Sequence, residues 1–361
     1  MKKERILYLD FIKALAIYLV CFYHYNNLNV DFLSQSSFSA YLNYLIKGVA
    51  STGVPLFLMV NGALMLNKDY KLKNHIIKII NIVLVTFIWG SITLVALAIM
   101  SETKYSANEF IISLWNWKGL NHLWFLRSLV CIYILYPLIK EVFDKDDKSI
   151  LKYTIFTIFI LTFGNVLLNI FVSIFKSCTG VNYIKGYEFN FFNDFNIFEG
   201  FYGYTLVYFI IGAVVFNKLN TNRIEFNLKQ QIYIFLLGII TLFLYGIMMS
   251  YLFKEIYDTV WNGYDTVMTL VMCMSIFILA FIGRNKMKKI SGIIQLIGAN
   301  TLGIYFIHWI IGYWLNIYYI RVPFSSTLFM NLLFATVKLG ISLNIVLILK
   351  KIPLIKLLFK I

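Results

Sequence analysis

The sequence predicts an all-α integral membrane protein, and three observations point to this fold class. The 361 residues are 60% hydrophobic and only 14% charged, whereas a soluble protein carries about 25% charged residues. Apolar runs of about 18 residues or more, each long enough to cross a bilayer as a helix, recur from one end of the chain to the other. Lys and Arg gather in alternate loops between these runs, as the positive-inside rule predicts.

The apolar runs predict a polytopic protein with about ten transmembrane helices, at approximately residues 6–26, 44–66, 76–100, 122–140, 150–174, 200–217, 231–253, 264–283, 293–315 and 326–349. With the N-terminus in the cytosol, the cytosolic loops hold about three times as many Lys and Arg residues as the outer loops. Both termini are therefore expected to be cytosolic. Because only short loops remain, residues 1–361 are expected to form a single transmembrane domain. The same bias explains the net charge of +15, so no nucleic-acid partner is expected.

Several kinds of soluble-enzyme site are not indicated by the sequence. The four Cys residues have neither a disulfide framework nor metal-ligand spacing, so no metal is expected. The chain also lacks a Gly-rich phosphate loop, a Gly-x-Ser-x-Gly nucleophile motif and a His-x4-Asp acyltransferase motif. Chemistry is therefore expected from polar side chains inside the membrane spans.

The first span, RILYLDFIKALAIYLVCFYH at residues 5–24, carries Asp10, Lys13 and His24. At about 100° per residue, Lys13 and His24 lie on one helix face with a rise of roughly 16 Å between them, and Asp10 lies one turn before Lys13. Ionisable groups cost several kcal/mol in lipid, so this face should line a cavity. There His24 could act as a general base or nucleophile, while Lys13 holds a phosphate group and Asp10 orients Lys13. A structural histidine and a lysine that snorkels to the inner surface are the alternatives.

Polar residues in the other spans could share this cavity. Arg127, in the block HLWFLR at residues 122–127, lies too deep to snorkel, so it should pair with a ligand or, as the alternative, form a structural ion pair. His308 lies toward the outer half of its span and could face His24. The side chains expected to line the acceptor side of the cavity are Tyr23, Asn61, His122, Trp124, Arg127, Asn300 and His308.

Two kinds of loop could contact substrates at the membrane surfaces. The basic run from Lys68 to Lys78 could bind the phosphates of a nucleotide-bearing donor, although the positive-inside rule alone also explains it. The outer loops, of which residues 175–199 are the longest, are rich in aromatic residues and Asn. These rings could line a sugar-binding groove or form the aromatic belt of the membrane interface.

Four blocks of the sequence resemble the membrane-bound acyltransferase-3 family, whose members O-acylate cell-surface glycans in bacteria. LDFIKALAIYLVCFYH at residues 9–24 matches the family's Arg/Lys-x10-His signature. VPLFLMVNGALML at 54–66, HLWFLRSLVCIYILYPLI at 122–139 and IGANTLGIYFIHW at 297–309 follow in the family's order. The resemblance implies a multi-pass protein of the bacterial plasma membrane. It also implies the stand-alone type of the family, without an extracytoplasmic esterase-like domain.

The resemblance further implies roles for individual residues. His24 falls on the family's essential catalytic histidine. Lys13 falls on the basic residue that engages the coenzyme A side, where most members have Arg, and Lys lacks the bidentate phosphate recognition of Arg. The family's Arg-x-x-Arg pair is replaced here by His75-Ile-Ile-Lys78. The expected donor-binding residues are Lys13, Lys71, His75 and Lys78.

The residues and the resemblance together predict a membrane O-acyltransferase. It would move an acetyl group from cytosolic acetyl-CoA to a hydroxyl group of an extracytoplasmic glycan or lipid-linked glycan, with no permanently bound cofactor. Its catalytic residues would be His24, Lys13 and Asp10. The alternatives are a succinyl donor, transfer through a separate partner protein, export of a polysaccharide, and a membrane scaffold for a glycan synthase. An exporter should show matching broken helices in two halves of the chain, and the Pro55–Gly62 segment has no such counterpart.

Overall fold

The computed structural model describes residues 5–101, 105–179, 191–192, 195–197, 202–221 and 226–359. These residues form helices and loops without a β-strand, which confirms the predicted all-α fold. Much of the outer loop at 175–199 lies outside the described residues. The α-helices are α1 (Leu7–Tyr23), α2 (Phe38–Gly48), α3 (Gly53–Leu66), α4 (Leu72–Ser101), α5 (Ala107–Trp115), α6 (Trp124–Asp144), α7 (Ser149–Thr179), α8 (Tyr204–Asn220), α9 (Leu228–Phe253), α10 (Val267–Ile282), α11 (Ser291–Gly298), α12 (Thr301–Tyr319), α13 (Leu328–Leu349) and α14 (Pro353–Leu357).

Within the described part of the chain, seven helical segments are long and apolar enough to cross a membrane. Helices α1, α8 and α12 occupy the remaining expected spans. The polytopic membrane fold is therefore confirmed, while the cytosolic location of both termini stays a prediction. We refer to the end of the molecule near Leu7 of α1 as the inner end and to the end near Tyr23 as the outer end. The seven segments are Phe38–Leu66, Leu72–Ser101, Asn121–Asp144, Ser149–Lys176, Leu228–Phe253, Val267–Gly298 and Leu328–Leu349.

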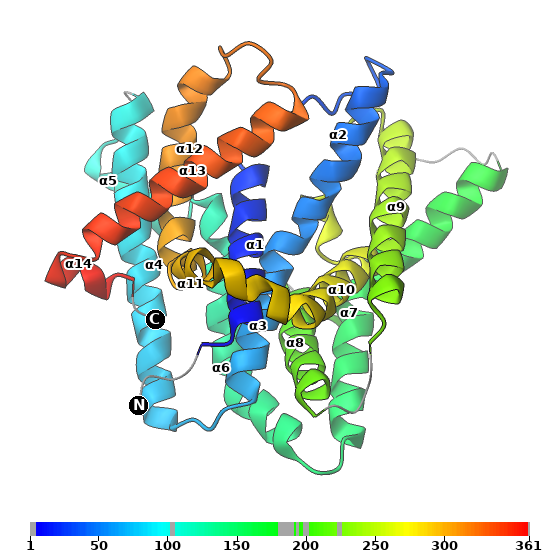
Figure 1. Cartoon of the computed structure of the whole chain (residues 1–361), viewed down its shortest axis with the longest axis vertical. Coiled ribbons are helices and arrows are strands. Elements are labelled where there is room, and N and C mark those ends of the chain that lie inside the picture. Colours follow the sequence, from blue (N-terminus) through cyan, green and yellow to red (C-terminus); the bar gives the residue numbers. More distant parts are fainter. Residues whose placement is uncertain are drawn as a thin grey trace.

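Helix α1 lies in the centre of the fold, packed against α3, α11 and α13 (Figure 1). Its apolar residues Leu9, Ile12, Ala16 and Ile17 are buried. Its neighbours on several sides are therefore other helices. This position explains how a helix with ionisable side chains can lie at membrane depth, because those side chains face protein-lined space.

The Pro55–Gly62 segment is a continuous part of α3. Pro55 lies in the first turn, where its missing N–H has no intrahelical partner to lose. Gly62 allows α3 to approach α8 closely, because a Cβ atom there would lie 1.7 Å from the carbonyl oxygen of Phe209. Small residues permit this kind of close packing between membrane helices.

The boundaries of the first and the ninth expected spans differ from the structure in ways that affect the candidate site. Helix α1 ends at Tyr23, earlier than the expected residue 26, and Tyr25 has a left-handed backbone with φ 56°. The expected span at 293–315 is divided between α11 and α12. A 3₁₀ helix, Gly283–Ile290, joins α10 to α11, and the resulting yellow band crosses α1 in Figure 1.

Candidate active site

The backbone at the outer end of α1 is held by two side chains. His24 directly follows the helix and has an extended backbone, with φ −79° and ψ 135°. Asn26 Nδ2 donates a hydrogen bond to the Tyr23 carbonyl, and Lys338 Nζ donates one to the His24 carbonyl. The last carbonyl groups of a helix lack partners within the helix. These two hydrogen bonds supply partners and fix the position from which the His24 ring projects.

Three of the four His residues of the chain gather at this point. The centroid of the His24 ring lies 5.5 Å from that of His308 and 4.9 Å from that of Trp309. His122 stacks on Trp309 with centroids 4.5 Å apart and an angle of 11° between the planes. We refer to His24, His122 and His308 as the histidine cluster.

The hydrogen bonding of His308 indicates which ring nitrogen carries the hydrogen. Nδ1 lies 2.6 Å from the Tyr305 carbonyl oxygen. Because a carbonyl oxygen only accepts, Nδ1 is the donor, and Nε2 of the neutral ring has a lone pair. Among the described residues, neither His308 Nε2 nor either ring nitrogen of His122 has a hydrogen-bond partner, and all three are buried. Buried polar atoms are normally paired, so these nitrogens could bind groups of a substrate.

A cavity of about 430 Å³, the outer cavity, lies beside the histidine cluster. Aromatic rings form much of its wall: the ring centroid of Trp124 lies 4.9 Å from that of Tyr202 and 5.3 Å from that of Trp261. Four of the seven residues expected on the acceptor side therefore lie together with His24. The lining residues are Tyr23, His24, Asn121, His122, Trp124, Arg127, Tyr202, Trp261 and Trp309.

Two more cavities lie toward the inner end. The middle cavity, of about 230 Å³, is lined by Lys13, Phe57, Val60, Asn61, Leu64, Lys78, Phe125, Leu129, Tyr133, Thr301, Leu302 and Tyr305. The inner cavity, of about 730 Å³, is lined by Leu64, Met65, Lys68, Asp69, Tyr70, Lys71, Asn74, His75, Lys78 and Tyr136. Leu64 and Lys78 belong to both linings, so the middle and inner cavities adjoin each other.

Lys13 is oriented by an ion pair. Its Nζ lies 2.6 Å from a carboxylate oxygen of Asp10, and Asp10 also accepts two hydrogen bonds of 2.7 Å from Arg5. Asp10 is only 3% exposed, and a buried carboxylate needs such partners. About 21 Å of helical rise separates Asp10 from His24. Asp10 is therefore placed to orient Lys13 and does not contact the histidine cluster.

Tyr305 lies between the middle cavity and the histidine cluster. Its ring lines the middle cavity and its centroid lies 5.6 Å from that of His308. Its hydroxyl group donates a hydrogen bond to the His122 carbonyl. Lys13 lines the middle cavity and His24 lines the outer cavity, and roughly 16 Å of helical rise separates these two residues.

Two residues that were expected on the acceptor side, Asn61 and Asn300, lie elsewhere, whereas His75, a donor-side candidate, lines the inner cavity. Asn61 lines the middle cavity and accepts a hydrogen bond of 3.3 Å from Tyr133 Oη. His75, in the wall of the inner cavity, is buried and its Nε2 donates to the Tyr133 carbonyl over 2.7 Å. Asn300 lines none of the three cavities, because its amide nitrogen bonds to Leu296 and its amide oxygen to Lys350. The expectation that Asn61 and Asn300 face the acceptor does not fit these positions.

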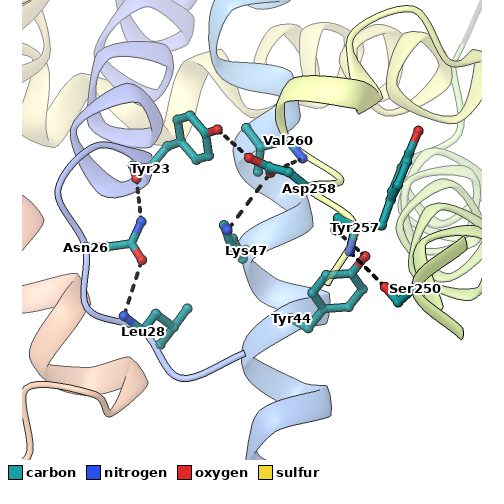
Figure 2. Close-up of polar contacts among 9 residues, drawn as sticks. All are labelled: Tyr23, Asn26, Leu28, Tyr44, Lys47, Ser250, Tyr257, Asp258 and Val260. Atoms are coloured by element: carbon teal, nitrogen blue, oxygen red, sulfur yellow. Dashed lines mark hydrogen bonds and ion pairs between the residues drawn. The ribbon is translucent and has the colours of Figure 1, made fainter. Parts of the chain in front are cut away.

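Two residues next to His24 were not among the candidates from the sequence. Lys338 is fully buried in α13 and bonds to the His24 carbonyl. Asp258 accepts a hydrogen bond of 2.6 Å from Tyr23 Oη and lies 4.0 Å from Lys47 Nζ, as Figure 2 shows. Lys338 is visible in the sequence as a cation in mid-span, but its partner is a backbone carbonyl. No sequence signal links Asp258 to Tyr23.

Comparison with known proteins gives one match. The model of the acyltransferase-3 family, described as an acyltransferase domain, matches residues 6–351. No curated protein and no solved structure matches the chain. The matched range contains α1, the lining residues of all three cavities and the histidine cluster.

Proposed function

The chain belongs to the acyltransferase-3 family, and we propose that it moves an acetyl group from cytosolic acetyl-CoA to a hydroxyl group of an extracytoplasmic glycan. The observation that carries this proposal is the order of the three cavities from the inner end to the outer end of the molecule. The inner cavity is rich in lysine, the outer cavity adjoins the histidine cluster, and the middle cavity lies between them. This order suits a phosphate-bearing donor and a sugar acceptor that approach from opposite sides of the membrane.

The donor would enter through the inner cavity. Lys71 and Lys78 would bind the phosphates of acetyl-CoA, since ammonium groups attract phosphate as point charges. Lys13, oriented by Asp10, would hold the donor at the entrance to the middle cavity. The extended pantetheine arm is comparable in length to the roughly 16 Å between Lys13 and His24. It would carry the thioester past Tyr305 to the histidine cluster.

In the proposed reaction, the acceptor hydroxyl oxygen attacks the thioester carbonyl carbon. His24 takes the hydroxyl proton as a general base. The new ester C–O bond forms, the C–S bond breaks, and the proton passes to the thiolate, so that free coenzyme A leaves as a thiol. The alternative order begins with attack by a His24 ring nitrogen on the thioester, and the acceptor hydroxyl then takes the acetyl group from the imidazole. Both orders need His24 beside both substrates.

The proposal is tested on the surface glycans of cells that make the protein, cells that lack it, and cells that make His24→Ala. Mass spectrometry of these glycans reports the acyl group and the acceptor together. Because general base catalysis contributes about a hundredfold to ten-thousandfold, His24→Ala should leave a folded protein and lower acetylation by about a thousandfold. Cells that lack the protein should still carry the glycan on their surface, without the acetyl group.

Two results would contradict the proposal. If the folded His24→Ala protein acetylates the glycan normally, His24 has no role in transfer. If cells without the protein lose the polymer from their surface and accumulate it inside, the protein exports the polymer. If the glycan carries a succinyl group, the proposed mechanism still holds, but the donor is succinyl-CoA and not acetyl-CoA.

A further inference from the structure

Arg127 places a cation in the wall of the outer cavity. It is in the first turn of α6 and lines the same cavity as His24. None of the described residues that line this cavity is Asp or Glu. The outer cavity therefore carries positive charge without a carboxylate in its described lining.

Both the helix and the burial of Arg127 favour an anion beside it. The N-terminal end of a helix carries partial positive charge, so a cation in the first turn is unfavourable unless an anion is near. Arg127 Nε is buried and has no hydrogen-bond partner among the described residues. The guanidinium group lies against the ring of Trp117, at 5.2 Å from the ring centroid, and this contact supplies no hydrogen-bond acceptor in the ring plane.

An acidic residue that contacts the outer cavity's wall already has partners. Asp258 accepts the hydrogen bond from Tyr23 and lies 4.0 Å from Lys47 (Figure 2). The described structure thus shows no carboxylate paired with Arg127. Arg127 is half-buried, and its buried Nε has no acceptor, so a hydrogen-bonded ion pair with a ligand would offset the cost of that unpaired donor.

The rings beside Arg127 define the kind of molecule that would carry the anion. Trp124, Tyr202 and Trp261 lie in mutual contact and line the same cavity, with ring centroids 4.9 to 6.1 Å apart. Flat rings of this kind bury the apolar faces of a bound ring. A guanidinium group presents paired donors that match the two oxygens of a carboxylate or phosphate group.

We propose that Arg127 is an anion-binding residue of the acceptor site and that the acceptor glycan carries a carboxylate or phosphate group close to the hydroxyl that is acetylated. The proposal rests on the proposed function, because the acceptor is defined by the acetyl transfer. It goes further by assigning the acceptor to the acidic glycans and by naming the residue that selects them.

The test uses the purified full-length protein, acetyl-CoA with a labelled acetyl group, and the glycan isolated from cells that lack the protein. Three forms of this glycan are compared: untreated, chemically reduced so that carboxylates become neutral alcohols, and enzymatically dephosphorylated. The untreated form should be the better acceptor by about tenfold or more in kcat/KM, since hydrogen bonds to charged groups are strong. The treatment that removes the preference identifies carboxylate or phosphate as the anion.

The variants Arg127→Gln and Arg127→Lys separate charge from geometry. In Arg127→Gln the ratio of kcat/KM between the untreated and the neutralised glycan should fall to about one. The fall should come from a higher KM for the untreated glycan. Arg127→Lys should give an intermediate ratio, because it keeps the charge and loses the paired donors. Arg321→Gln is the matched control: this Arg is exposed and lies outside the linings of the three cavities, so the ratio should stay that of the wild type.

Each outcome of these experiments either supports or overturns the assignment of Arg127. The proposal is overturned if the isolated glycan has no anionic group, if the wild type uses the neutralised glycan equally well, or if Arg127→Gln keeps the wild-type ratio. If the wild type acetylates no form of the glycan, the proposed function fails, and the assignment of Arg127 falls with it.

Discussion

The inner cavity and the outer cavity differ in the kinds of side chain that line them. The inner cavity presents Lys68 and Lys71, which are exposed, and Lys78, which is half-buried. The outer cavity presents rings in mutual contact and one Arg residue. Lysines are point charges on flexible stems, whereas packed rings keep a fixed shape. The inner end is therefore suited to hold phosphates in several geometries, and the outer end is suited to select an acceptor by shape.

Lys13 and Lys338, the two lysines that form polar contacts with residues of the first span, also differ in their partners. Lys13 is paired with the carboxylate of Asp10, so its charge is partly balanced before any ligand binds. Lys338 has no carboxylate partner among the described residues and holds the His24 carbonyl. In the proposed mechanism, Lys13 would attract the donor and Lys338 would position the reacting His24.

If Lys13 binds the donor, its replacement should have the largest effect after that of His24 itself. Loss of a partly buried charge contact of this kind costs several kcal/mol, so Lys13→Met should lower kcat/KM for acetyl-CoA by about a hundredfold, mostly through KM. Lys13→Arg should retain most of the activity, because the charge remains. Asp10 keeps its bonds to Arg5, so the fold should persist. Initial rates against acetyl-CoA concentration measure the change.

The control for this prediction is Lys73→Met. Lys73 is an exposed cation of α4 near the inner cavity but outside its lining. It should leave KM for acetyl-CoA within about twofold of the wild type, as surface charges usually do. If Lys13→Met raises KM for the acceptor instead, the comparison between the two ends of the molecule is wrong.

The positions of Asp10 and Lys13 could be predicted from the sequence because they depend only on helical geometry. The cost of charge in lipid requires a protein-lined space for these residues and for His24, but α1 ends at Tyr23, so helical spacing does not set the direction of the His24 ring. The Asp10–Lys13 ion pair follows from the same spacing. Helix periodicity and hydropathy therefore account for the fold class and for one side of the candidate site.

The other side of the site depends on packing between helices, which the sequence does not reveal. His308 reaches His24 because α12 packs against α1, and His122, in the 3₁₀ turn before α6, joins them by stacking on Trp309 of α12. Lys338 bonds to the backbone carbonyl of His24. Every residue has a backbone carbonyl, so no sequence motif identifies this partner. Asn300 was expected at the acceptor because it is polar and in mid-span, yet the break between α11 and α12 places it beside Lys350.

Lys338→Met tests whether Lys338 acts on catalysis by fixing the position of the His24 backbone and not through its charge. The variant removes the hydrogen bond to the His24 carbonyl, so kcat should fall by about tenfold, in line with the loss of one bond to a charged group, while KM for acetyl-CoA stays unchanged. Replacing a buried cation with an apolar side chain of similar length should leave the thermal stability unchanged or raise it by about 1 kcal/mol. Lower activity with undiminished stability is a result that a purely structural lysine would not give.

The matched control for Lys338 is Lys350→Met. Lys350 also bonds to a polar oxygen near the end of a helix, but that oxygen belongs to Asn300, outside the three cavities. Its replacement should leave kcat unchanged. If Lys338→Met keeps the wild-type kcat, or if it lowers kcat and thermal stability together, the position of the His24 backbone does not limit the rate.

The smallest effect is expected at the hydrogen bond between Tyr23 and Asp258, because it acts on a wall of the outer cavity. Tyr23→Phe and Asp258→Ala should each raise KM for the acceptor by about threefold to tenfold, the value of one hydrogen bond, with KM for acetyl-CoA unchanged. The double variant should lose no more than either single variant, since both remove the same bond. Tyr41→Phe, which breaks an exposed hydrogen bond to Tyr251, is the control and should change neither KM.

Additive losses in the double variant would mean that Tyr23 and Asp258 contact the acceptor separately. The outer cavity would then select its substrate by individual polar contacts instead of by a fixed shape.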